Sequence, residues 1–142
     1  LGPKFAFSLL KTVMKISYKV IGKRSPRDPQ GPLKYYAVLK RKGTTSTAEL
    51  CKRIAKKSGL HSAILEASLR AMATELQNEV AEGRAVKIDG LGTFSLKVNS
   101  EGKPTAEQIR AHHIQGAKIN FHSDAALKKL LKKLSFYRPR KT

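Results

Sequence analysis

The strongest constraint on the fold is the segment at residues 87–97, which reads Lys-Ile-Asp-Gly-Leu-Gly-Thr-Phe-Ser-Leu-Lys. Its apolar side chains alternate with polar ones on both sides of a glycine pair, and a period of two is typical of a strand with one buried face. Gly90 and Gly92 suit a tight bend or bulge between two such strands. The segment therefore predicts a hairpin with one face that must be covered.

The net charge of the 142-residue chain is +19, from 29 Lys and Arg against 10 Asp and Glu. An excess of this size favours a polyanionic partner, nucleic acid first and an anionic membrane second, over a merely soluble basic protein. The excess is uneven, because residues 44–99 are nearly neutral while both flanks are strongly cationic. No apolar run approaches the length of about 20 residues that spans a bilayer, so we expect no membrane partner.

The N-terminal flank divides in two. Residues 1–14 are expected to be a leader, either added for expression or misread upstream, because Met14 resembles a natural initiator. Residues 15–43 predict a basic β extension, with two runs of strand-forming residues around a loop at 25–32 that contains three prolines.

Two helices are expected next. Ser46 and Glu49 form a capping-box pattern at the start of the first helix, and Gly59 is placed to end it. The second helix should span residues 62–81. Its exposed side is acidic, and phosphates repel acidic side chains, so we interpret the pair as a dimer scaffold rather than a groove reader.

The C-terminal third predicts an arm, a strand and a helix. Residues 105–108 satisfy a second capping box, which predicts a short helix through about His112. A return strand is expected at 117–121, and an amphipathic helix at 124–134 has leucines on one side and lysines on the other. Residues 135–142 are expected to be a frayed basic tail.

Three blocks of sequence resemble the bacterial HU/IHF family of histone-like proteins. Residues 90–94, Gly-Leu-Gly-Thr-Phe, are close to that family's Gly-Phe-Gly-Thr-Phe hairpin signature. Residues 57–60, Lys-Ser-Gly-Leu, match its helix junction, and Phe121 followed by Ala-Leu-Lys at 126–128 matches the start of its last helix. The resemblance covers residues 44–134, and the extension is similar to that of a longer HU-related branch.

The resemblance implies an α+β fold with an antiparallel helix pair, a three-stranded antiparallel sheet with a shortened arm, and a C-terminal helix. It also implies an intertwined homodimer, which a sheet with one uncovered face and a small core requires. The expected dimer core is Leu69, Met72, Leu76, Phe94, Leu96 and Phe121. In the family a proline at the arm tip wedges between bases, and Pro104 is the candidate here, although the Arg-Asn-Pro tip is missing.

The implied function is non-enzymatic: an architectural protein of the bacterial nucleoid, in the cytoplasm, that binds and bends double-stranded DNA with low sequence specificity and condenses it. The candidate DNA-binding residues are Lys97, Lys103, Pro104, Arg110, Lys118, Lys128, Lys129 and Lys132, with Lys23, Arg24 and Arg27 from the extension. No cofactor is expected.

Two alternatives remain open. An RNA-binding protein would use Tyr35-Tyr36 and Phe136-Tyr137 to stack bases. A regulator would bind a protein partner through its extension. The sequence contains no nucleophile with a base, carboxylate pair or metal cluster that would favour an enzyme. Cys51 is a lone cysteine on a helix, so we expect a small core residue.

Overall fold

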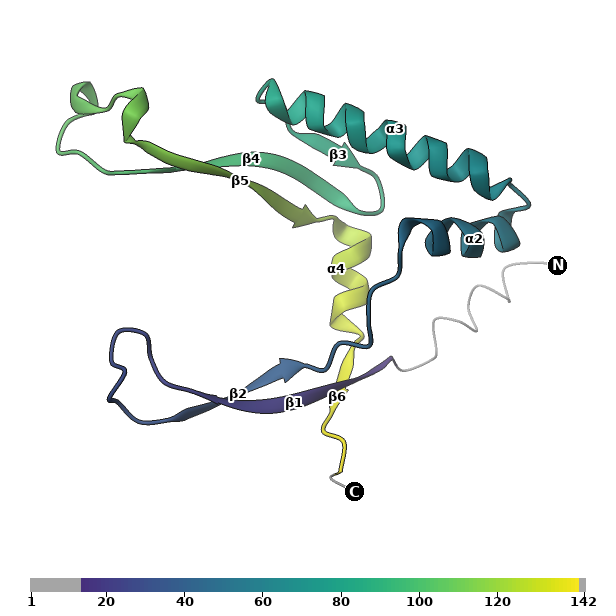
Figure 1. The fold of residues 1–142 in the computed structure, drawn as a ribbon, viewed down its shortest axis with the longest axis horizontal. Coiled ribbons are helices and arrows are strands. Elements are labelled where there is room, and N and C mark those ends of the chain that lie inside the picture. The colour runs from purple at the N-terminus through teal and green to yellow at the C-terminus, as the bar shows by residue number, and fades with distance from the viewer. Residues whose placement is uncertain (1–13, 141–142) are drawn as a thin grey trace. The chain divides into compact units, whose positions relative to one another are not determined.

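The computed structural model describes residues 14–140, which form two compact units of helices and sheets. Unit 1 contains residues 14–44 and 129–140, and unit 2 contains residues 45–128. Figure 1 shows the chain from its first described strand to its last. Apart from Met14, the expected leader lies outside the described residues.

Unit 2 begins with the two expected helices, α2 (Thr47–Ser58) and α3 (Ser62–Ala81). Ser46 caps α2, because its Oγ accepts a hydrogen bond from the Glu49 N–H at 3.2 Å. Gly59 ends the helix in the left-handed region, at φ 73°. The expected helices and both ends of α2 are confirmed.

The predicted hairpin lies in a three-stranded antiparallel sheet of order β3-β4-β5. Its strands are β3 (Val86–Ile88), β4 (Gly92–Ser100) and β5 (Ile114–Ser123). Gly90 makes the turn between the first two strands at φ 85°. The sheet is therefore confirmed, and its return strand is longer than the 117–121 that was expected.

Gly92 lies where two strands approach too closely for a side chain. A Cβ atom built on it would lie 2.0 Å from the carbonyl oxygen of His122 and 2.8 Å from a ring carbon of Phe121. Its φ of 157° is also one that other residues rarely adopt. Glycine is required here by space as well as by backbone geometry.

The arm tip differs from the helix expected through His112. It contains two separate 3₁₀ turns, η1 (Ala106–Gln108) and η2 (Ala111–His113), and Thr105 makes no capping hydrogen bond through its side chain. The backbone between the turns is extended at Arg110 (φ −132°, ψ 162°). A helix of so few residues with little to pack against is not stable, and the segment instead reverses the chain in two short steps.

Unit 1 contains the sheet β2-β1-β6, formed by β1 (Lys15–Lys23), β2 (Lys34–Leu39) and β6 (Ser135–Tyr137). The first two strands are antiparallel, and β6 is parallel to β1. The prediction of a frayed tail was therefore wrong at residues 135–137, which form a strand paired with β1. The last helix, α4 (Ala125–Lys132), connects the two units and is shorter than expected.

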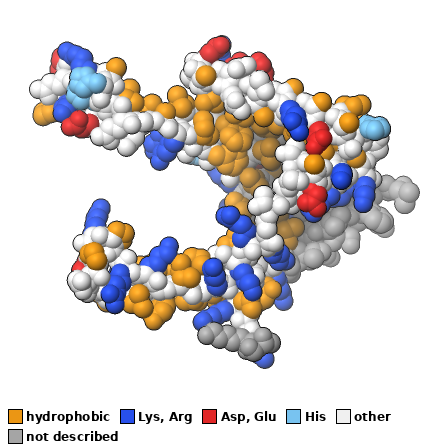
Figure 2. Space-filling view, in the orientation of Figure 1, with side chains coloured by type: hydrophobic (Ala, Val, Ile, Leu, Met, Phe, Trp, Pro, Cys, Tyr) orange, Lys and Arg blue, Asp and Glu red, His pale blue; other side chains and the backbone are white. Residues whose placement is uncertain are grey.

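Few apolar side chains are buried in the single chain. Among the described residues the buried hydrophobic ones are Cys51 and Val80, and the expectation for Cys51 is confirmed. On the sheet of unit 2, Leu96, Ile119 and Phe121 share one face but keep exposed fractions of 44%, 52% and 42%. Figure 2 shows hydrophobic side chains gathered between α3 and this sheet.

Three residues of the expected dimer core, Phe94, Leu96 and Phe121, lie on this face by register, and the other three lie on α3. Leu69, Leu76 and Phe94 are half-buried, whereas Met72 is 41% exposed. The rings of Phe94 and Phe121 pack with their centroids 4.8 Å apart. The lone chain thus leaves its best apolar surface partly uncovered.

Replacing Gly92 with alanine should destabilise unit 2, because the added methyl group collides with the β5 backbone. We expect a loss of about 1–3 kcal/mol or more in the free energy of unfolding, measured by urea denaturation. Gly116→Ala is the matched control, since its Cβ would meet nothing within 4 Å. Equal stability of the two variants would contradict the close approach at Gly92.

Candidate nucleic-acid interface

The sheet of unit 2 has a polar face opposite its apolar one. In the β4–β5 register Ser95 pairs with Asn120 and Lys97 with Lys118, and strand alternation puts both pairs on the face away from Phe94. We call this surface the arm face: Thr93, Ser95, Lys97, Lys118, Asn120 and His122. It carries no acidic side chain.

Lys97 and Lys118 are direct cross-strand partners. Like charges in this position repel each other and weaken the sheet. An anion bound between the two ammonium groups would relieve that repulsion. The structure thus brings together two of the predicted residues in an arrangement that suits a phosphate.

The other predicted residues of the arm contact nearby groups. Lys103 forms an ion pair with Glu101, with Nζ and Oε1 3.0 Å apart. The Arg110 guanidinium donates hydrogen bonds to the carbonyl oxygens of Glu107 and Ile109. Pro104 is exposed at the tip. The two cations are therefore partly engaged within the arm, unlike Lys97 and Lys118.

The predicted lysines of α4 are all exposed. Lys128 and Lys132 are four residues apart and so share one side of the helix, while Lys129 lies beside them. No acidic residue lies within α4. The helix therefore presents a continuous cationic side.

The extension contains a second like-charge pair, because Lys23 of β1 lies opposite Lys34 of β2. Arg24 and Arg27 follow in the β1–β2 loop, which contains a turn with a 3.0 Å hydrogen bond from the Asp28 N–H to the Ser25 carbonyl. Sequence reasoning named the cations but missed both lysine pairs. Their partners depend on strand register, which the sequence does not specify here.

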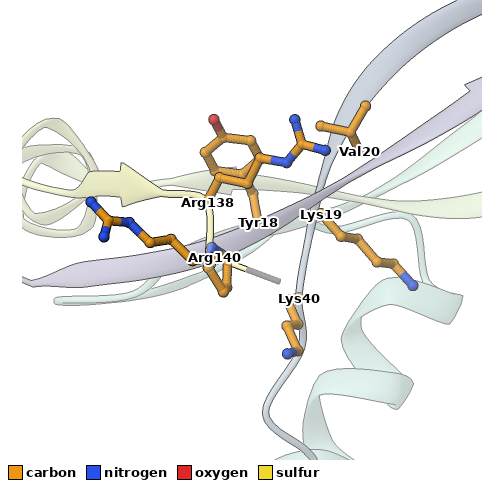
Figure 3. A pocket seen from close by; sticks show the side chains of 7 residues that line it. Tyr18, Lys19, Val20, Lys40, Arg138 and Arg140 are labelled. Atoms are coloured by element: carbon orange, nitrogen blue, oxygen red, sulfur yellow. The ribbon is translucent and has the colours of Figure 1, made fainter. Parts of the chain in front are cut away.

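A cationic hollow of about 540 Å³ also lies on unit 1 (Figure 3). Four cations line it together with Tyr18 and Val20: Lys19 within β1, one residue after β2 and two after β6. The lining residues are Tyr18, Lys19, Val20, Lys40, Arg138, Pro139 and Arg140. Sequence reasoning missed this hollow because residues 138–140 were placed in a tail.

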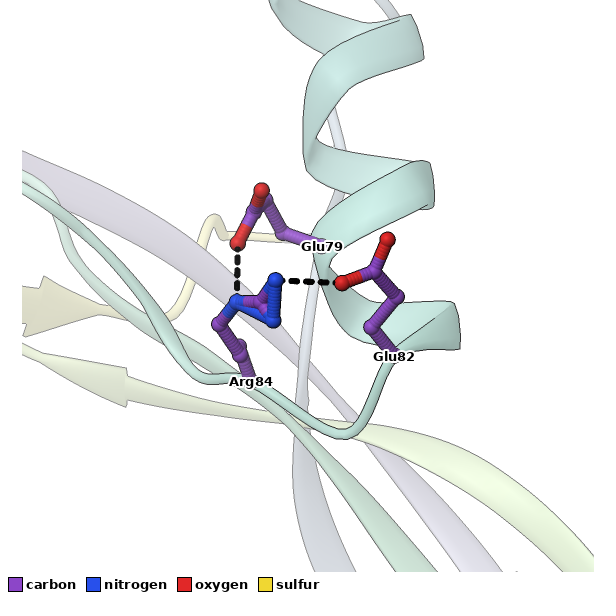
Figure 4. Close-up of polar contacts among 3 residues, drawn as sticks. All are labelled: Glu79, Glu82 and Arg84. Carbon is purple, nitrogen blue, oxygen red and sulfur yellow. Dashed lines mark hydrogen bonds and ion pairs between the residues drawn. The ribbon is translucent and has the colours of Figure 1, made fainter.

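The ion pairs of the described residues lie in unit 2 and away from the arm face. Arg84 binds Glu79 at 3.0 Å and also Glu82, both at the C-terminal end of α3 (Figure 4). Arg53 and Glu49 pair at 3.8 Å on α2. Three of the four ion pairs within residues 14–140 thus neutralise cations of the helical scaffold, the fourth joins Glu101 to Lys103 near the arm tip, and none involves the arm face.

Asp124 fastens the central hairpin to the start of α4. Its Oδ2 accepts from the Gly90 N–H at 2.8 Å and its Oδ1 from the Ala126 N–H at 2.7 Å. These two backbone donors, with smaller contributions from the Leu127 N–H and the charge of Lys87, lower the pKa of Asp124 despite partial desolvation. The charged carboxylate of Asp124 therefore links the turn at the base of the arm to the start of α4.

Other site types have no support within residues 14–140. No group of three or more His, Cys, Asp or Glu side chains is placed there to hold a metal ion. None of the helices described is both long and apolar enough to cross a membrane.

The two-faced sheet, its helix pair and its cationic arm define a small basic α+β protein built around an extended hairpin. A comparison with protein-family models matches residues 14–138 to HU-HIG, a family described as an HU domain fused to a wHTH, Ig or glycine-rich motif. The chain belongs to this family. No curated protein matches it at a significant level.

Similar solved structures include a candidate bacterial DNA-binding protein from Bacteroides vulgatus, at 14% identity and a TM-score of 0.62. The match covers 91% of this chain and 50% of that one, so this chain spans half the length of that relative. An HU mutant from Thermotoga maritima has 22% identity and a TM-score of 0.45, and the match covers 61% of this chain and 99% of that one. HU from an Anabaena HU–DNA cocrystal has 17% identity and a TM-score of 0.46, and the match covers 61% of this chain and 97% of that one.

The low pKa of Asp124 predicts an acid-dependent loss of stability. A carboxyl group whose pKa is lower in the folded state stabilises the fold above its unfolded pKa, and this contribution disappears as pH falls through the folded pKa. Below about pH 4, the thermal midpoint of the wild type should therefore fall more steeply than that of Asp124→Asn. Scanning calorimetry from pH 7 to pH 2.5 measures the difference.

Asp89→Asn is the control, because Asp89 lies in the same turn but accepts no hydrogen bond from α4 among the described contacts. Identical pH profiles for the wild type and Asp124→Asn would contradict the role of this carboxylate.

Proposed function

We propose that this chain is a non-enzymatic architectural protein that binds and bends double-stranded DNA with low sequence specificity. The observation that carries the proposal is the cross-strand pair of Lys97 and Lys118 on an arm face without acidic residues. Membership of an HU domain family is consistent with this role. In the bacterial cytoplasm it would act on the nucleoid and help to condense DNA.

The arm face can contact phosphates by charge and by hydrogen bonds. Lys97 and Lys118 would neutralise them, and Ser95 and Asn120 would donate to phosphate oxygens. Specific reading of base edges relies mainly on bidentate Arg, Asn or Gln side chains in the major groove. This face offers Asn120 alone of these types, and its Nδ2 is already 2.9 Å from the ring Nε2 of His122.

The remaining predicted residues would add further contacts. Lys128, Lys129 and Lys132 on α4 would follow a phosphate backbone, and Lys23, Arg24 and Arg27 would contact DNA separately from unit 1. Lys103 and Arg110 would have to exchange their local partners for phosphates. Pro104, which is exposed at the tip, would wedge between base steps if the arm enters the minor groove.

We further propose that the functional form is an intertwined homodimer. The apolar face of unit 2, with Leu96, Ile119 and Phe121, needs a partner surface, and a second copy supplies one by two-fold symmetry. Leu69, Met72, Leu76 and Phe94 would join the same core. A dimer would also bring two arms to one DNA molecule and double its cationic surface.

DNA binding is tested by the salt dependence of duplex affinity. Lys97→Gln/Lys118→Gln should weaken binding at low salt and reduce the slope of log affinity against log salt by about 1.8, because each lost phosphate contact removes about 0.9. Lys128→Gln/Lys132→Gln should flatten the slope similarly. Fluorescence anisotropy with a labelled duplex over a salt titration measures both quantities.

Lys52→Gln/Lys56→Gln removes the same charge from α2, outside the proposed interface, and serves as the control. If the salt slope falls as much in this control as in the arm variant, binding depends on net charge alone. An unchanged slope in the arm variant would remove the arm face from the interface.

The dimer is tested by placing a charge on the apolar face. In a stable monomer Ile119→Asp would be nearly neutral, since the side chain is 52% exposed. In the proposed dimer it buries an unpaired carboxylate and should dissociate or unfold the protein. Sedimentation equilibrium with circular dichroism distinguishes the cases, and Ile114→Asp near the arm tip, at 47% exposure, is the control.

A further inference from the structure

One face of the unit 1 sheet carries no charge. By register Tyr18 lies opposite Leu39, Tyr35 opposite Gly22, and Ile16 opposite Phe136 of β6. We call this surface the aromatic face: Ile16, Tyr18, Val20, Tyr35, Ala37, Leu39 and Phe136. The other face holds the lysines of β1 and β2 together with Tyr36 and Tyr137.

The aromatic face is open to solvent. Tyr35 is 71% exposed, Phe136 63% and Leu39 55%. All four tyrosines of the chain lie in unit 1, whereas the aromatic residues of unit 2 are Phe94 and Phe121, which pack on each other. Exposed aromatic side chains are thus concentrated on one sheet, where they are available to a ligand.

Two hollows meet at Tyr18 on this face. The cationic hollow described above includes Lys40, Arg138 and Arg140 and no acidic residue (Figure 3). A second hollow of about 370 Å³ is lined by Tyr18, Phe136 and the apolar residues of β2 between 37 and 39. A site for a negative group therefore adjoins a site for a flat apolar one.

The positive charge of unit 1 indicates which kind of ligand the aromatic face binds. Its described residues contain 14 Lys and Arg against Asp28 alone, and none of the ion pairs found among the described residues involves them. A second copy of the same face would bring equally cationic rims together, which repel each other. A nucleotide carries a phosphate and a planar base, the two groups that these hollows suit.

Single strands suit this site better than duplexes, because a duplex keeps its bases stacked inside. We propose that the aromatic face of unit 1 binds single-stranded nucleic acid. Arg138, Arg140 and Lys40 hold a phosphate, and the base stacks against Tyr18 and Phe136. This site uses none of the residues proposed for duplex binding by unit 2.

The test measures the affinity of the full chain for labelled dT and U oligonucleotides of about 12 nucleotides and for a duplex, all at the same salt concentration. Phe136→Leu keeps an apolar side chain but removes the ring. It should weaken single-strand binding about tenfold and leave duplex binding unchanged. Arg138→Gln/Arg140→Gln should reduce the single-strand salt slope by about 1.4. The ratio of the affinities for the dT and U oligonucleotides shows whether DNA or RNA is preferred.

Tyrosine emission gives a second readout. The chain has no Trp, so emission from its four tyrosines reports on unit 1 directly. Stacking of a base on Tyr18 should quench part of this emission when dT oligonucleotide is added, and Tyr18→Leu should remove that part. Absence of quenching in the wild type at saturation would overturn the proposal.

Tyr36→Leu is the matched control, since it removes a ring from the opposite face of the same sheet. Equal loss of single-strand binding in Tyr36→Leu and Phe136→Leu would overturn the assignment to the aromatic face. A change in sedimentation of Phe136→Leu would assign the face to a second copy instead. Loss of duplex binding by Lys97→Gln/Lys118→Gln with intact dT binding would separate this site from the proposed duplex function.

Discussion

The structure of unit 2 depends on a sheet with two unlike faces. One face gathers Phe94, Leu96, Ile119 and Phe121, and the other carries the opposed lysines of β4 and β5. In the proposed dimer, burial of the first face would contribute about 25 cal/mol per Å² of apolar area and so help to offset the like-charge repulsion on the second face.

The distribution of acidic residues has the same logic. Glutamates sit on α2, at the end of α3 and near the arm tip, where they pair with Arg53, Arg84 and Lys103. Such exposed pairs contribute little to stability. Their larger effect is to confine the positive potential to particular surfaces, and a confined potential steers an anionic partner to those surfaces.

Much of unit 2 could be predicted from sequence because its signals are local. Ser46 and Gly59 mark helix ends through contacts within one turn, and Gly90 and Gly92 mark a hairpin whose strands are adjacent in the chain. The capping pattern at Thr105 misled, because a cap stabilises only a helix that also has something to pack against.

The features that sequence reasoning missed depend on distant pairings. The opposition of Lys97 and Lys118 requires the register of β4 and β5, and β6 is a strand of three residues that exists through its pairing with β1. The aromatic face follows from the same pairing, since Phe136 joins Tyr18 only when β6 is in place. Short runs such as Ser-Phe-Tyr carry too little pattern to predict a parallel partner.

The parallel pairing of β1 and β6 has a consequence for biosynthesis. The Ser135 N–H donates to the Met14 carbonyl at 3.0 Å, across 121 positions of the chain. At about 5–20 residues per second, a ribosome takes on the order of ten seconds to synthesise the stretch between them. During that time the edge of β1 that later pairs with β6 stays open, while the helices and central hairpin of unit 2 are completed. The sheet of unit 1 is therefore completed after unit 2, although it contains the first described strand.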